Sequence, residues 1–305
     1  MRRASSLILS FAALAACGED EATSRAASPQ PEASPEASPE ADPEADPEAS
    51  PEASPEASPE AMPEPEPEPA AELPRNFDLI RGDKFTRLVL EVDEAPGAEA
   101  RPQALEALAA GLQGLLDKPG GVVVVRDAAL QGHGRDHRWT TGDMKGEAAE
   151  SFDLEVPEDT IKLHIVYLEG RSPADDGSKR VLGMAWDHTH LAIFKQTIED
   201  LCGDSAPLLA DREAFCQAAE SSVLTHEVGH LLGLVDNDLP MVTDHRDPDP
   251  SHGRHDVNRE CVMFFAHEGE DMFSTLGGLF MGGQSQGLGF DAACLADIAA
   301  VRDAP

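Results

Sequence analysis

The chain has 305 residues and a formal net charge of −35. So acidic a chain offers no basic surface for nucleic acid, and no cluster of Lys or Arg suggests binding to anionic lipid headgroups. The length would allow two domains, but the first quarter is too poor in aromatic and branched apolar residues to bury a core. We therefore expect one folded domain.

Residues 1–16 have the pattern of an export signal. Two arginines precede an apolar run from Leu7 to Ala16, which is far shorter than the ~20 residues that span a bilayer. The run ends in Leu-Ala-Ala-Cys and resembles the lipobox of bacterial lipoproteins, whose cysteine becomes the lipidated first residue. The resemblance implies a mature protein that begins at Cys17 and is lipid-anchored in the bacterial cell envelope, at the outer membrane or the cell surface.

Residues 17–75 have the composition of a linker. From about Ser28 to Pro69 the chain repeats Ser-Pro-Glu-Ala or Asp-Pro-Glu-Ala. A proline every few residues prevents helix formation and strand pairing, and the like charges repel, so we expect a disordered, extended spacer. At ~3 Å per residue it could hold the following domain on the order of 100 Å from the membrane.

Residues 76–305 carry the pattern of the folded domain. Phe85 to Val92 predicts a strand, Ala104 to Leu116 a helix and Val122 to Val125 a second strand. This order predicts a right-handed crossover between parallel strands. Ile161 to Leu168 is nearly all apolar and predicts a central strand.

The second half of the domain has fewer regular elements. We expect, in chain order, a strand Val181 to Trp186, a turn Asp187 to Thr189, a strand Leu191 to Phe194, a helix from about Asp211 to Gly233, and a closing helix Ala292 to Val301. Between the last two helices the chain is expected to be mostly loop, and the glycine-rich stretch Gly277 to Gly289 is expected to be flexible.

The segment with the clearest chemistry runs from His226 to His230 and has the form H-E-x-x-H. Two histidines four positions apart lie on one face of a helix, so both imidazoles can bind one metal ion. Glu227 lies about 100° around the helix, where it can accept a proton from water and pass it to a leaving amine. His226 and His230 are therefore predicted metal ligands, and Glu227 is the predicted general base.

The surroundings of the motif strengthen this interpretation. Gly233 suits the left-handed turn that ends a helix and lets the chain return a third ligand. An apolar stripe on another face predicts that the helix packs against the sheet. The stripe consists of Leu224, Val228, Leu231 and Val235.

Further along the chain, His255 and Asp256 are followed after four residues by Cys261-Val262-Met263. Together with H-E-x-x-H-x-x-G, this arrangement resembles the metzincins, which have a further His or Asp and then a methionine in a tight turn beneath the metal. The stretch is similar to the archaemetzincin pattern H-C-x4-C-x-M, with Asp256 in place of the first cysteine. Residues 183–186, Gly-Met-Ala-Trp, also look like the metzincin edge strand, whose backbone would pair with an extended substrate.

The resemblance implies an α+β fold with a twisted mixed sheet, a backing helix, the active-site helix and a loop-rich lower half. It also implies a Zn²⁺ cofactor, Met263 in the turn beneath it, and hydrolysis of peptide bonds in extended protein substrates by a monomer. The rival interpretation is a cell-surface binding or adhesive domain with a structural zinc. Glu227 argues against the rival, because a structural site does not need that carboxylate and prefers a fourth protein ligand.

Two residues compete for the third ligand position. Asp236 stands where the metzincin count from Gly233 places it, whereas His255 requires an insertion of about nineteen residues. Only His255 keeps the spacing to Met263, and we favour it as the third ligand. The single tyrosine, Tyr167, falls in the predicted central strand, so no tyrosine is expected to stabilise the transition state.

With Cys17 as the lipid carrier, four cysteines remain in a chain expected to be exported. Of the three connectivities we favour Cys202 with Cys216 and Cys261 with Cys294, because closing short loops costs the least chain entropy. The loop from Asp244 to His255, rich in Asp and His, is expected to be solvent-exposed, and a second ion bound there, such as calcium, is the alternative.

Overall fold

The computed structural model describes residues 76–175, 179–205 and 211–304. The predicted signal peptide, Cys17 and the predicted linker lie outside these ranges. Within them, no helix is both long enough and apolar enough to cross a membrane.

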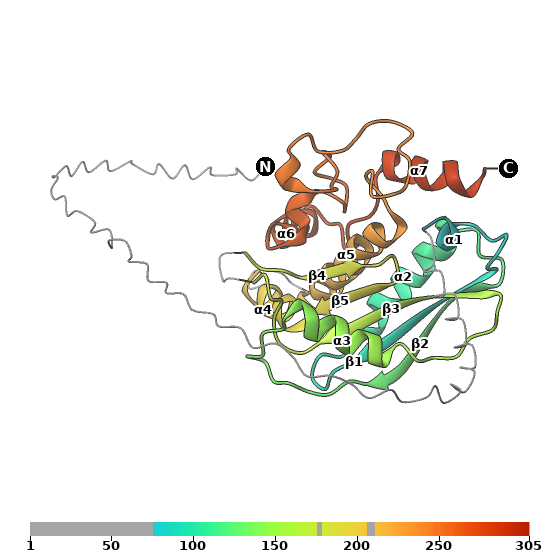
Figure 1. Ribbon diagram of the computed structural model, residues 1–305. Coiled ribbons are helices and arrows are strands. Elements are labelled where there is room, and N and C mark those ends of the chain that lie inside the picture. Colours follow the sequence, from blue (N-terminus) through green and yellow to red (C-terminus); the bar gives the residue numbers. More distant parts are fainter. Residues whose placement is uncertain (1–75, 176–178, 206–210, 305) are drawn as a thin grey trace, which may run out of the picture. The chain divides into compact units, whose positions relative to one another are not determined.

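The centre of the domain is a five-stranded mixed sheet with the order β2-β1-β3-β5-β4 (Figure 1). Its strands are β1 (Arg87–Glu94), β2 (Gly121–Ala129), β3 (Thr160–Leu168), β4 (Gly183–Trp186) and β5 (His190–Phe194). β1 pairs in parallel with β2 and β3, and β3 pairs in parallel with β5. β4 pairs antiparallel with β5 and forms one edge. The predicted parallel crossover and the central position of β3 are confirmed.

The helices and short 3-10 turns complete the fold. They are α1 (Asn76–Ile80), α2 (Pro102–Leu115), α3 (Thr141–Ser151), α4 (Lys195–Ser205), α5 (Arg212–Leu232), η1 (Pro250–His252), η2 (Phe265–Glu268), α6 (Asp271–Met281) and α7 (Ala292–Arg302). The orange and red segments, which include α6 and α7, lie on the side of α5 away from the sheet (Figure 1).

Two apolar clusters fill the two faces of the sheet. The larger one joins residues of β1 and β3 to α2 and α5, and it includes the stripe Leu224, Val228, Leu231 and Val235, which is buried as predicted. The smaller one joins the opposite face to α3 through Met144 and Ala148. The α+β class, the mixed sheet, the backing helix α2 and the helix α5 that carries the H-E-x-x-H motif are therefore as expected.

Helix α5 has the predicted limits. Asp211 caps its start, accepting a hydrogen bond from the Ala214 amide, and Gly233 ends it in the left-handed conformation (φ 83°). A Cβ added at Gly233 would lie 2.4 Å from the carbonyl oxygen of Asn237. Glycine is therefore required here both for the backbone angle and for the close approach of the next turn.

A buried carboxylate fixes α5 to the rest of the core. Glu220 is fully buried and accepts hydrogen bonds from the Arg101 amide (2.8 Å), the Arg101 guanidinium (2.9 Å) and the Tyr167 hydroxyl (3.1 Å). The Lys195 ammonium also contacts it. Tyr167 is therefore committed to the core.

Glu220→Ala is expected to destabilise the domain by about 2–3 kcal/mol, because Arg101 and Lys195 would keep only Glu199 as a shared anionic partner and the buried Tyr167 hydroxyl would lose its acceptor. Urea or thermal unfolding measures the loss. Glu213→Ala is the matched control, since that carboxylate pairs with the same arginine but its side chain is 75% exposed, and it should cost less than about 1 kcal/mol. Equal losses in the two variants would contradict the assignment of Glu220 as the anchor.

The glycine-rich stretch departs from expectation. Its first residues, from Gly277 to Met281, belong to α6 instead of a flexible loop. Met272, Phe273 and Leu276 of this helix are buried, and Phe273 meets Phe215 of α5 edge-on at 6.1 Å between ring centroids. Packing against α5 therefore outweighs the low helix propensity of the glycines.

One of the two expected disulfides is present. Cys202 and Cys216 are bonded and join α4 to α5, as predicted. The prediction of a second disulfide is not met, because Cys261 and Cys294 are buried free thiols with 3.7 Å between their sulfur atoms. Chain-entropy reasoning places these two side chains together but does not decide their oxidation state.

Candidate metal centre

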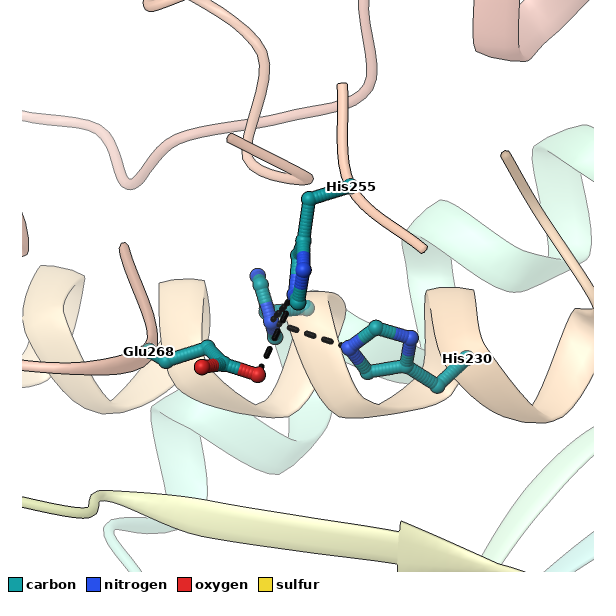
Figure 2. A group of neighbouring side chains, drawn as sticks. His230, His255 and Glu268 are labelled. Carbon is teal, nitrogen blue, oxygen red and sulfur yellow. Dashed lines mark hydrogen bonds and ion pairs between the residues drawn. The ribbon is translucent and has the colours of Figure 1, made fainter. Parts of the chain in front are cut away.

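Three histidines converge over helix α5. His226 and His230 project from one face of the helix, and His255 reaches them from the loop that follows it. The Nε2 atom of His226 lies 3.1 Å from that of His230 and 3.4 Å from that of His255. Figure 2 shows the labelled His230 and His255 rings directed at the same point. The structure thus brings together the three predicted ligands.

Backbone carbonyls orient two of these rings. The Nδ1 atom of His226 donates to the Val262 carbonyl (2.7 Å), and that of His255 donates to the His252 carbonyl (2.5 Å). A ring that donates through Nδ1 presents an Nε2 lone pair when it is neutral. Both lone pairs therefore face the shared point, in the manner of metal-binding histidines whose other nitrogen is held by a carbonyl.

The surroundings keep two of the imidazoles neutral. Burial, followed by the proximity of His230 and His255, places the pKa of His226 well below its usual range. Burial and then His255 lower the pKa of His230 to about 3. Neutral imidazole is the form that binds metal, so the site is prepared for a cation at neutral pH.

Met263 packs against helix α5 at Gly229, which lies between His226 and His230 in the sequence. It is fully buried, and a Cβ added at Gly229 would lie 2.3 Å from its sulfur. Gly229 stands between the two histidines of the motif, so the absence of a side chain there makes room for the methionine. The carbonyl of Val262, the residue before Met263, accepts the hydrogen bond from His226. The segment around Met263 therefore both packs against α5 and orients one of the histidines.

Glu227 lies beside the histidines, toward the sheet. Its side chain is buried beneath the edge strand β4, where a Cβ added at Gly183 would lie 2.6 Å from its Oε1 atom. Burial, and then the charge of Glu268, raise the pKa of Glu227 well above its usual range. A carboxylate with a raised pKa is suited to exchange protons near neutral pH.

Asp236 does not join this group. Its carboxylate contacts the guanidinium groups of Arg254 and Arg246, the latter at 3.1 Å. Its own backbone is left-handed (φ 58°). Arg254, the residue before His255, is thus tied to Asp236, four residues beyond the end of α5. This favours His255 as the third ligand and gives Asp236 the role of holding the loop that carries His255.

A carboxylate that the sequence did not predict, Glu268 of η2, lies beside the three histidines. The Oε1 atom of Glu268 lies 3.2 Å from the Nε2 of His255, and Figure 2 shows its side chain pointing at the histidines. Burial would raise its pKa, but the hydrogen bond and charge of His255 prevail and lower it. Glu268 stands five residues after Met263, outside the motifs from which the ligands were predicted.

The loop from Asp244 to His255 is largely exposed, as expected, except for His245 and His255, which are buried. His245 points inward and bridges two buried aspartates, Asp256 at 2.6 Å and Asp297 at 2.8 Å. His252 turns to a different partner, Asp247, at 2.9 Å. His245 and His252 therefore do not share a ligand set, and His245 fastens the loop to helix α7 instead.

The donors fit a divalent metal ion. The ligand atoms of His226, His230, His255 and Glu268 all lie within 4.8 Å of one another. A tetrahedral ion with ligands at ~2.0–2.1 Å separates them by ~3.4 Å, close to the distances above, and imidazole with carboxylate is a donor set that zinc prefers.

Comparisons with known proteins give two similar structures. Archaemetzincin from Methanopyrus kandleri is 15% identical over 72% of this chain and 96% of its own, with a TM-score of 0.41. A zinc-dependent peptidase from Methanocorpusculum labreanum is 14% identical over 69% of this chain and 99% of its own, with a TM-score of 0.40. No protein-family model and no curated protein matches the chain.

Proposed function

We propose that the protein is a zinc-dependent endopeptidase that acts on extended protein substrates. One observation carries the proposal: three histidine nitrogens meet at one point, next to a buried glutamate beneath a sheet edge. The three histidines and Met263 account for a metal centre. Glu227 is the additional group that hydrolysis needs and that a purely structural centre does not.

The residues would divide the reaction between them. Zinc held by the three histidines would polarise the substrate carbonyl and lower the pKa of a water to about 7. Glu227 accepts a proton from the attacking water at its carboxylate and then donates it to the departing amine. Burial beneath the edge strand at Gly183 raises the pKa of this carboxylate, which suits it to both roles.

The edge strand supports an extended substrate. β4 pairs on one side with β5, and among the described strands none pairs with its other side. A cavity of about 220 Å³ beside Trp186 and His230 lies at its end, and one of about 340 Å³ beside Arg180, Phe265 and Glu268 lies at its start. A peptide added along β4 would pass the metal centre with side chains near both cavities.

The test is hydrolysis of casein or a peptide library by the full chain, with and without a chelator, and after zinc is restored. We expect cleavage that stops with the chelator and returns with zinc. Zinc binding without cleavage would favour the rival function, a binding domain with a structural metal.

We further propose that the protein is displayed at the cell envelope through a lipid on Cys17. Cys17→Ser should block lipidation, so that the protein leaves the membrane fraction or remains an uncleaved precursor. Firm anchoring needs more than one acyl chain, and a multiply acylated Cys17 would supply them. Fractionation and mass measurement check this. A mutant of mature mass that stays with the membrane would refute the lipobox assignment.

A further inference from the structure

Glu268 is placed like a ligand of the metal centre, although it lies outside the motif. Its Oε1 is 3.2 Å from His255 Nε2, and the histidine nitrogens are 3.1 and 3.4 Å apart. Ligands of one tetrahedral zinc ion are separated by ~3.4 Å. The glutamate oxygen therefore stands at this spacing from the His255 nitrogen, and all four ligand atoms lie within 4.8 Å of one another.

The contact between Glu268 and His255 calls for a cation. The Nδ1 of His255 already donates to the His252 carbonyl, so its Nε2 and the carboxylate oxygen can approach each other only across a shared cation, either a proton on Nε2 or a metal ion. The Nε2 lone pair of His226 faces the same point, since its Nδ1 donates to Val262. A proton can bridge only one pair of these atoms, whereas a divalent ion can bind the Glu268 oxygen and the histidine nitrogens together.

We propose that Glu268 is a fourth ligand that closes the metal site when no substrate is bound, and that it leaves the site when substrate arrives. The inference rests on the proposed peptidase function. A zinc site with four protein ligands is typical of structural zinc, while a catalytic site keeps one position open. Hydrolysis by this centre therefore requires the carboxylate to move away.

The position of Glu268 permits this movement. Its side chain is 41% exposed, compared with 5% for His255, and it borders the cavity at the start of β4. Its second oxygen lies 4.0 Å from the Lys179 ammonium, on the segment that leads into β4. A substrate entering along the edge strand would meet the carboxylate first, and the displaced group would have a cation within reach.

The proposal predicts opposite effects of Glu268→Gln on two properties. Loss of an anionic ligand should weaken zinc binding at least tenfold. Without the Glu268 carboxylate, an added ligand no longer competes with it for the fourth position on the metal, so the added ligand should bind more tightly. If the carboxylate occupies that position for ~90% of the time in the wild type, the affinity for the added ligand rises about tenfold. The kcat/KM of peptide hydrolysis at saturating zinc should rise by the same factor.

The experiment uses the full chain loaded with zinc or cobalt. Zinc affinity is measured by competition with a chromophoric chelator, and the visible spectrum of the cobalt form reports changes in its ligands. Acetohydroxamate, a small bidentate metal ligand, is titrated into the cobalt form to measure access to the open position. Glu270→Gln is the matched control, because this carboxylate lines the same cavity but is not among the clustered ligands.

We expect Glu268→Gln to bind zinc at least tenfold more weakly, to change the cobalt spectrum and to bind acetohydroxamate about tenfold more tightly, with Glu270→Gln like the wild type. If Glu268→Gln matches Glu270→Gln, Glu268 is not a ligand. Weaker zinc binding with unchanged acetohydroxamate affinity would overturn the displacement. If the metal measurements agree but no form cleaves peptide, the displacement holds and the proposed peptidase function fails.

Discussion

Glu227→Gln is expected to reduce peptide hydrolysis by about a thousandfold or more while zinc stays near stoichiometric. Glutamine keeps the size of the side chain, so the contact with Gly183 under the edge strand is retained. It cannot, however, accept a proton from water, and general-base catalysis with the metal is lost. Steady-state kinetics and metal analysis of the same preparation measure the two effects.

The comparison with Glu268→Gln makes this result specific. Both variants neutralise one carboxylate near the histidines, but we expect Glu227→Gln to lose activity and keep metal, and Glu268→Gln to bind metal less tightly and hydrolyse faster when saturated. Unchanged turnover in zinc-loaded Glu227→Gln would remove the proposed role of Glu227.

The second large effect concerns the third ligand. His255→Ala is expected to abolish zinc binding at micromolar free metal, because it removes one of the three imidazoles that meet at the site. Asp236→Ala should weaken zinc binding at most 10 to 100-fold, the range for a residue that orients a ligand without touching the metal. Asp236 contacts Arg246 and Arg254, and it acts on the site by holding Arg254, next to His255.

A zinc titration of the two variants, followed by metal competition, ranks them. If Asp236→Ala loses zinc and His255→Ala retains it, the site would be His-His-Asp and the histidine loop would be a surface insertion. The wild-type geometry favours the larger loss of zinc in His255→Ala, because the Asp236 carboxylate pairs with Arg246 and Arg254 and not with the histidines.

Strands and the motif helix could be predicted because their signals are local. β3 is nearly all apolar, as a strand buried on both faces must be, and α5 is delimited by a capping aspartate and a left-handed glycine. That the two histidines proposed as metal ligands share one face of α5 follows from helix periodicity. Each of these features depends on residues within a few positions of one another.

The elements that were missed depend on contacts or on weak signals. α4 begins at Lys195, directly after β5, so no turn residues mark its start. α3 buries only Met144 and Ala148, which gives little periodicity, although Thr140 with Asp143 is a capping pair that could have revealed it. The low helix propensity of the glycines in α6 gave no sign of a helix, because α6 is stabilised by packing against α5.

Within the site, the three clustered histidines could be predicted from the sequence, but the carboxylate beside them could not. Spacing to the methionine led to His255, and the structure places that residue with the motif histidines. Glu268 could not be found in this way, because nothing in its neighbourhood has the spacing of a ligand. Only the path of the chain through η2 brings it to His255.

The contact between Gly229 and Met263 has a consequence for recognising related chains. The motif H-E-x-x-H leaves two positions open, yet in this fold the second of them has no room for a side chain above the methionine sulfur. A pattern written as H-E-x-G-H, with C-x-M about thirty residues later, would describe this architecture more faithfully. It would reject chains that share the metal-binding pair but have no space for a methionine beneath it.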